Sequence, residues 1–156
     1  MKTLILYASK YSAAGELAQC IAQKMDGALV CNLKQGKIPA LADFDCIIIG
    51  SSLYAGMIRP EAKKFLLKYA DVLSGKKLGL FLSGIGAEGE KTYFENNFSP
   101  DILQKVKVKS FLGGIFDPKK AGVFERLIIK AVAKKSAYIN IIDDAKIEQF
   151  VKAMKA

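Results

Sequence analysis

The sequence has no histidine among its 156 residues. Histidine is the usual general base near neutral pH, the commonest metal ligand and the middle member of the charge relay of serine and cysteine hydrolases. Its absence argues against hydrolases of those types, and we expect no metal site and no catalytic side chain. Any chemistry would then belong to a bound cofactor.

Cysteine is scarce, and so are long apolar runs. The three cysteines, Cys20, Cys31 and Cys46, lie in apolar segments, which fits reduced, packed side chains better than disulfides or a metal cluster. No run reaches the roughly 18 to 20 apolar residues that cross a bilayer. Met1 and Lys2 lead into an apolar segment without a cleavage-type signal, so we expect a cytoplasmic chain.

Apolar residues and positive charge are plentiful. A hydrophobic content of 51% in 156 residues is enough for one continuous core, so we expect a single domain over residues 1–156. The 24 basic and 15 acidic residues give a net charge of +9. Such a field attracts nucleotides, nucleic acid and acidic membrane surfaces alike, and charge alone does not choose among them.

Apolar segments alternate with segments of helical periodicity along the chain. Helical spacing follows the first apolar segment and begins again at Pro60, Pro100 and Asp143. This alternation predicts an α/β fold with a parallel sheet covered on both faces. The predicted strands are residues 3–8, 28–33, 45–50, 77–83 and 106–116, the last bent at Gly113-Gly114.

The loops that follow the first, third and fourth predicted strands should meet at one edge of the sheet. They are residues 9–14, 51–57 and 83–87. This edge is the expected place for a ligand, because parallel sheets bind ligands beyond the carboxyl ends of their strands. The first loop leads into a helix, whose unpaired N–H groups favour a phosphate, and Lys10 adds charge. The loop lacks the glycines of P-loop and dinucleotide fingerprints, and an ordinary turn that binds nothing is the alternative.

The other two loops could hold a flat ring. Tyr54 offers a stacking surface beside Gly56, although it could instead pack on the neighbouring helix. Gly84 and Gly86 offer unhindered N–H groups, although both could simply form turns. Together the three loops predict a site for a nucleotide-like cofactor.

Three segments resemble the flavodoxin-like family, and most closely its branch of menaquinone-dependent protoporphyrinogen oxidases. They read LILYASKYSAAGELA, IIIGSSLYAGMIRPEAKKFL and LGGIFDPKKAGVFERLIIKAVAKK. The resemblance implies a three-layer αβα sandwich around a five-stranded parallel sheet in the order 2-1-3-4-5, with FMN bound noncovalently. The family usually has a glycine where Ser12 stands and a hydroxyl residue where Ala14 stands.

The resemblance also implies which residues contact FMN. The implied residues are Ser9, Lys10, Tyr11, Ser12, Ala13 and Ala14 around the phosphate, Ser52, Leu53, Tyr54, Ala55 and Gly56 on one side of the ring, and Ser83, Gly84, Ile85 and Gly86 on the other.

A flavin redox protein is the function that the resemblance implies. Its partner would be a redox protein or a quinone, and the branch implies a quinone-dependent protoporphyrinogen oxidase. Two alternatives stay open: a flavodoxin-type electron carrier without a substrate of its own, and a flavin-free basic module that binds anions. Whether the chain is an enzyme stays open with them.

An extra basic segment at about residues 113–140 distinguishes this chain from a short flavodoxin. We expect a helix over 118–135 with an apolar stripe, and Arg126, Lys130 and Lys134 fall on one row of it. A basic amphipathic helix can lie on an acidic bilayer, while a solvated face over ordinary packing is the alternative. Nucleic acid is not an expected partner.

Overall fold

The computed structural model of the chain describes residues 1–11, 13–117 and 138–156. The predicted helix at 118–135, with most of the segment 113–140, lies outside the described residues, and so does Ser12.

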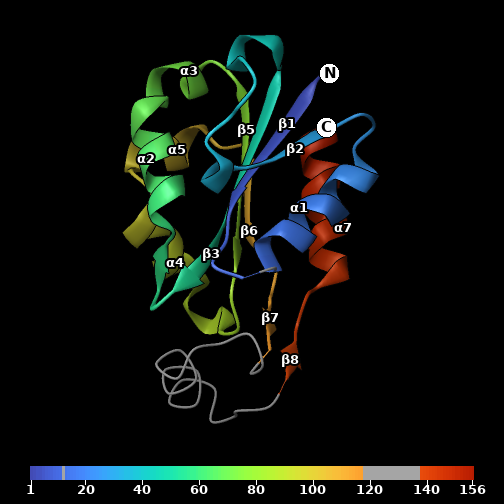
Figure 1. Cartoon of the computed structure of the whole chain (residues 1–156), viewed down its shortest axis with the longest axis vertical. Helices are drawn as coiled ribbons and strands as arrows, with labels where there is room; N and C mark the ends of the chain where they lie inside the picture. The colour runs from blue at the N-terminus through green and yellow to red at the C-terminus, as the bar shows by residue number, and fades with distance from the viewer. Residues whose placement is uncertain (12, 118–137) are drawn as a thin grey trace.

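A parallel sheet of five strands forms the centre of the molecule, in the order β2-β1-β3-β5-β6 (Figure 1). Counted along the chain as parallel strands, this is the predicted order 2-1-3-4-5, so the predicted fold is confirmed. A short strand, β4, pairs antiparallel with the end of β3 as an addition to the predicted five. The strands are β1 (Thr3–Ala8), β2 (Leu29–Asn32), β3 (Cys46–Tyr54), β4 (Met57–Ile58), β5 (Lys77–Ser83) and β6 (Val108–Phe111).

Two layers of helices cover the sheet because its central strands are apolar on both faces (Figure 1). On one face, Ile5, Ile48 and Phe81 pack with buried residues of two helices, α1 (Ala13–Lys24) and α7 (Asp144–Lys155). On the other face, the core includes Leu4, Ile49 and Leu80. The elements of that layer are α2 (Pro60–Lys68), α3 (Ala70–Ser74), α4 (Glu90–Asn97) and α5 (Pro100–Lys105), and short 3₁₀ turns lie at Leu33–Gln35, Leu41–Asp43 and Ala87–Gly89.

The predicted strand at 106–116 is wrong in extent, because the chain leaves the sheet in its middle. After β6, Gly113 adopts φ +88°, a conformation that glycine adopts without strain. The chain then forms β7 (Ile115–Phe116), which pairs antiparallel with β8 (Ile139–Asn140) instead of continuing along β5. The predicted bend at Gly113-Gly114 is therefore present, and it separates two strands of different sheets.

The three cysteines carry free thiols. Cys46 is buried in β3, and this burial raises the pKa of its thiol above the ordinary value; partial burial does the same at Cys31. Both thiols are therefore protonated and poorly nucleophilic at neutral pH. Within the described residues, no helix is long and apolar enough to cross a membrane, and no group of side chains with metal-ligating chemistry is found.

Candidate functional site

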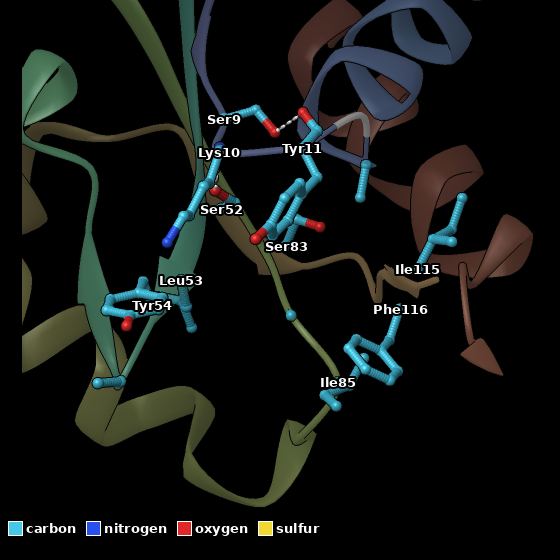
Figure 2. A pocket seen from close by; sticks show the side chains of 13 residues that line it. Ser9, Lys10, Tyr11, Ser52, Leu53, Tyr54, Ser83, Ile85, Ile115 and Phe116 are labelled. Atoms are coloured by element: carbon cyan, nitrogen blue, oxygen red, sulfur yellow. Dashed lines mark hydrogen bonds between the residues drawn. The ribbon is translucent and has the colours of Figure 1, made fainter. Parts of the chain in front are cut away.

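A cleft of about 110 Å³ lies where the loops after β1, β3 and β5 meet (Figure 2). Eleven of the predicted cofactor residues line it, together with two residues of β7 that the sequence did not single out. The structure therefore brings the three predicted loops to one place. The lining residues are Ser9, Lys10, Tyr11, Ala13, Ser52, Leu53, Tyr54, Ala55, Ser83, Gly84, Ile85, Ile115 and Phe116.

The first loop connects β1 to the start of α1. The Ser9 hydroxyl donates to the Tyr11 carbonyl oxygen within the loop. The Lys10 backbone N–H donates to Ser52 Oγ at 3.3 Å, which ties this loop to the end of β3. Helix α1 begins at Ala13, which is among the residues that line the cleft, so the helix N-terminus lies at the cleft wall.

The second loop is a tight hairpin that carries Tyr54. Tyr54 pairs with Met57 across a two-residue turn in which both residues are left-handed, Ala55 at φ +51° and Gly56 at φ +77°. Such turns match the twist of the strands they join, and glycine is favoured in them. The sequence Tyr-Ala-Gly-Met thus folds back on itself and presents the tyrosine ring at the edge of the cleft (Figure 2).

Asn97, at the end of α4, holds this hairpin in place. Its side-chain oxygen accepts from the Ile58 N–H at 2.9 Å. Its amide nitrogen donates to the Gly56 carbonyl at 2.9 Å and to the Tyr93 carbonyl at 2.8 Å. The side chain therefore satisfies backbone groups of the turn and of the second strand of the hairpin, and it anchors them to the helix.

Two cationic side chains lie over the Tyr54 ring. Lys10 Nζ is 4.4 Å from the ring centroid, and Arg59 Cζ is 5.6 Å from it. Figure 2 shows Lys10 extending from its loop toward the ring. The buried Ser51 hydroxyl holds the main chain of Arg59, because its oxygen accepts from the Arg59 backbone N–H at 2.9 Å. Both contacts are within the range of favourable cation–π interactions.

The third loop packs closely against the bend after β6. The Gly84 N–H donates to the Gly113 carbonyl at 3.1 Å. It is therefore not an open donor, in contrast to the prediction from sequence. A Cβ atom on Gly114 would lie 2.6 Å from the Gly84 carbonyl oxygen, so this approach of two backbones requires glycine.

Three of the predicted cofactor residues do not line the cleft. The Ala14 side chain is fully buried and packs in the core, so only its backbone could meet a ligand. Gly56 lies at the hairpin turn and Gly86 beyond the lining part of its loop. Ser12 falls outside the described residues. The contacts predicted for all the cofactor residues stay predictions.

Sequence reasoning missed Ile115 and Phe116. Both belong to β7 and line the side of the cleft opposite Tyr54 (Figure 2). The sequence does contain a pointer to them, because they directly follow the Gly113-Gly114 bend at the carboxyl end of a predicted parallel strand. That is the edge where the other three loops meet.

The lining fits a flat aromatic group with an anionic tail. Leu53, Ile85 and Phe116 give apolar walls, and Tyr54 gives an aromatic face. Lys10 and the start of α1 lie where an anion would be stabilised. Mostly apolar walls with a few polar groups are typical of cofactor clefts. The side chains present therefore fit FMN.

Three solved structures resemble this chain in fold. Oxidised flavodoxin 2 from Bacillus cereus has a TM-score of 0.60 at 19% identity, covering 99% of this chain and 98% of that chain. A flavoprotein in complex with FMN from Lactobacillus acidophilus has a TM-score of 0.53 at 15% identity, covering 70% of this chain and 92% of that chain. A flavo di-iron protein from Thermotoga maritima has a TM-score of 0.57 at 17% identity, covering 99% of this chain and 35% of that chain.

At such identities these structures show a shared fold and no more. None of the curated proteins matches the chain in sequence. The flavodoxin domain family, however, matches residues 4–139, which is most of the chain. The chain therefore belongs to the flavodoxin domain family.

Proposed function

We propose that this protein binds FMN in the cleft and transfers electrons through the flavin ring. The observation that carries the proposal is the meeting of a helix N-terminus, an aromatic face and apolar walls beyond the carboxyl ends of β1, β3 and β5. Membership of the flavodoxin domain family supports it. So does the likeness to a flavoprotein whose structure contains FMN.

Each part of the cleft has a separate task in this proposal. The backbone N–H groups at the start of α1 would hold the phosphate, and the Lys10 ammonium, which lies over the Tyr54 ring, would turn from that ring to join them. Tyr54 on one side and Phe116 on the other would enclose the ring and limit its contact with water. The bound flavin would supply the electron-transfer chemistry.

We further propose that the electron donor is a porphyrinogen and the acceptor a quinone. The resemblance of the three sequence segments to quinone-dependent protoporphyrinogen oxidases supports this finer assignment. Turnover of protoporphyrinogen with a menaquinone analogue, dependent on added FMN, is the expected result. Reduction by a flavodoxin reductase with no such turnover would instead assign an electron carrier between proteins.

FMN binding is tested by titrating the purified protein into FMN and following flavin fluorescence. We expect quenching with a defined endpoint, and we expect Tyr54→Leu to weaken binding about twofold to tenfold, since stacking is worth about 0.5 to 1.5 kcal/mol. Tyr69→Leu is the matched control, because Tyr69 also has a lysine over its ring, at 5.2 Å, and lies outside the cleft. A protein that stays colourless and quenches no flavin would leave the flavin-free, anion-binding function.

A further inference from the structure

A second hollow lies beside α2, apart from the cleft. Its volume is about 270 Å³, and it is lined by one face of α2 and by the segment after β2 that begins with the 3₁₀ turn Leu33–Gln35. Among the described residues, none lines both this hollow and the cleft. We call it the basic groove, after the lysines in its lining, which are Lys37, Lys64 and Lys68. The proposed function makes no use of it.

Part of the lining of the basic groove is apolar and aromatic. Leu33 and Ile38 contribute to it from the segment after β2, and Phe65 and Tyr69 contribute from α2 and its C-terminal boundary. The two rings lie 4.8 Å apart between centroids at an angle of 40°, and Phe65 is only 5% exposed. A ligand with an apolar body could therefore bury surface against fixed side chains here.

The charged part of the lining is mainly positive. Three lysines and one glutamate, Glu61, line the basic groove, which leaves a surplus of two positive charges. Lys64 and Lys68 are four residues apart on α2, a spacing at which like charges repel each other. None of the three lysines forms an ion pair with a described residue. An anion in the groove would relieve this repulsion and supply the missing negative charge.

The wall of the groove after β2 is held by hydrogen bonds within the turn. The Asn32 side-chain oxygen accepts from the Lys34 N–H at 2.9 Å, and the Gly36 N–H donates to the Leu33 carbonyl at 3.4 Å. Gly36 has φ +75°, a left-handed conformation that glycine adopts without strain. This wall is therefore formed without a ligand, so binding does not require it to become ordered.

We propose that the basic groove binds a small organic anion with an apolar body, such as an aromatic carboxylate. The carboxylate would lie among the three lysines, and the body would lie against Phe65 and Tyr69. The volume is close to the lower end of the range for small-molecule pockets, which favours a ligand of this size over a protein segment. Because the groove and the cleft share no described lining residue, binding here does not depend on FMN.

The location of binding is tested by titrating naphthoate, an aromatic carboxylate, into the isotope-labelled full chain and following the backbone amide chemical shifts. We expect saturable shifts at groove residues such as Gly36 and Tyr69, and none at the cleft residues Ser83 and Gly84. Shifts confined to the cleft residues, or shifts that do not saturate, would overturn the proposal.

The role of the lysines is tested with Lys64→Gln and Lys68→Gln. We expect each substitution to raise the dissociation constant of naphthoate about threefold, since an exposed cation contributes modestly to binding an anion. Lys152→Gln is the matched control: it removes an exposed lysine from α7, which packs on the opposite face of the sheet, and it should leave the dissociation constant unchanged. Equal effects of all three substitutions would overturn the proposal.

Two analogues test the two parts of the ligand separately. Acetate carries the charge without the apolar body, and naphthylmethanol carries the body without the charge. We expect each to bind about tenfold more weakly than naphthoate, because each forgoes either the burial of apolar surface or the attraction of the lysines. Acetate that binds as tightly as naphthoate would show a patch of lysines without a built site. Naphthylmethanol that binds as tightly would show that the lysines do not select the ligand, and either result would overturn the proposal.

Discussion

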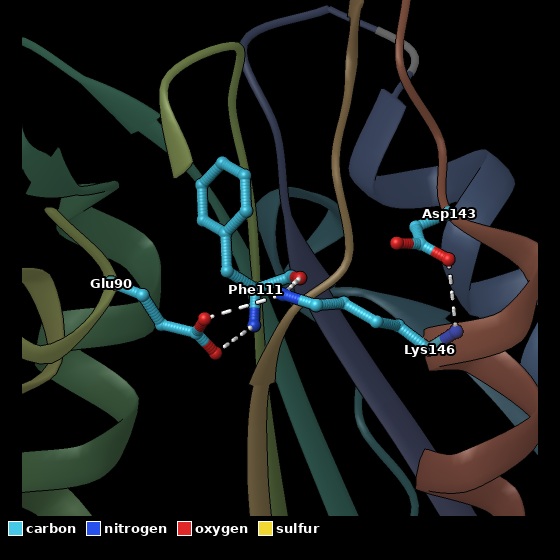
Figure 3. A network of polar contacts seen from close by, with 4 residues as sticks. All are labelled: Glu90, Phe111, Asp143 and Lys146. Atoms are coloured by element: carbon cyan, nitrogen blue, oxygen red, sulfur yellow. Dashed lines mark hydrogen bonds and ion pairs between the residues drawn. The ribbon is translucent and has the colours of Figure 1, made fainter. Parts of the chain in front are cut away.

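Glu90 and Lys146 form an ion pair that joins the two helical layers across the open edge of the sheet, with Lys146 Nζ 3.2 Å from Glu90 Oε2 (Figure 3). Glu90 Oε1 accepts from the Phe111 N–H at 2.9 Å, and Lys146 Nζ donates to the Phe111 carbonyl at 3.2 Å. The two side chains thus occupy the hydrogen-bonding positions of a missing neighbour strand. At Phe111 the edge strand therefore offers neither its N–H nor its carbonyl to another chain.

Removing either partner of this ion pair should destabilise the fold modestly. Both side chains are about one-third exposed, at 34% and 36%, so water weakens the pair. We expect Glu90→Ala and Lys146→Ala each to lower the free energy of unfolding by about 1 to 2 kcal/mol, with a coupling of about 0.5 to 1 kcal/mol in a double-mutant cycle. The control cycle on the exposed pair Lys91 and Glu95 should give a smaller coupling energy. Equal coupling energies in the two cycles would contradict a stabilising role of the pair between Glu90 and Lys146.

Asn97 should affect both stability and the candidate site. Asn97→Ala removes the partners of the Gly56 carbonyl and the Ile58 N–H, so we expect unfolding to become easier by about 1 to 3 kcal/mol. The freed hairpin should also bind FMN less tightly, because Tyr54 is no longer fixed. Asn96→Ala, an exposed neighbour in the same helix, should change stability by less than about 0.5 kcal/mol. Denaturant unfolding measures the stability of the two variants, and FMN titration measures their affinity. Equal values for both variants would contradict a role of Asn97 in holding the hairpin.

Ala55 is the non-glycine residue with positive φ among those described, at +51°. The left-handed conformation costs an ordinary residue about 1 to 2 kcal/mol, and glycine relieves this at some cost in chain entropy. We therefore expect Ala55→Gly to stabilise the protein by about 0.5 to 1 kcal/mol in denaturant unfolding. Gly56→Ala should do the opposite at the next position, where φ is +77°. A less stable Ala55→Gly protein would show that the turn has a different shape.

Gly114 should not accept any side chain. A Cβ atom there would meet the Gly84 carbonyl oxygen at 2.6 Å, so Gly114→Ala must push the third loop away from β7. We expect a loss of about 1 to 3 kcal/mol in stability and weaker FMN binding, since Phe116 shifts with the strand. Gly75→Ala is the control, because its Cβ would have no contact closer than 3.7 Å. Two equally stable variants would be incompatible with the close approach described for Gly114.

The sequence predicts well the parts of the fold that depend mainly on the local pattern of apolar residues. Strands β1, β3 and β5 each contain a short apolar run without polar alternation, a pattern typical of a strand that is buried on both faces of a parallel sheet. Their alternation with helical patterns fixes a parallel sheet and therefore the edge at which its loops meet. The position of the cleft follows from this, and Tyr54 lies at it as expected.

The parts that sequence missed depend on contacts distant in the chain. Helix α4 was not predicted because its sequence is mostly polar, with only Phe94 buried. Strands β7 and β8 have two residues each, and their pairing joins residues 115 and 140, which no local pattern reveals. The hydrogen bonds of Asn97 to the hairpin and the hydrogen bond between Gly84 and Gly113 likewise join separate elements. Asparagine and glycine are common in ordinary turns, so their presence in the sequence does not reveal these contacts.

The most direct test of FMN binding in the cleft is a crystal structure of the protein grown with FMN. The predicted result is a phosphate beside Lys10 and the start of α1, with the flavin ring between Tyr54 and Phe116. Density for FMN at another place on the protein, or a cleft filled by the protein's own side chains at saturating FMN, would contradict the account.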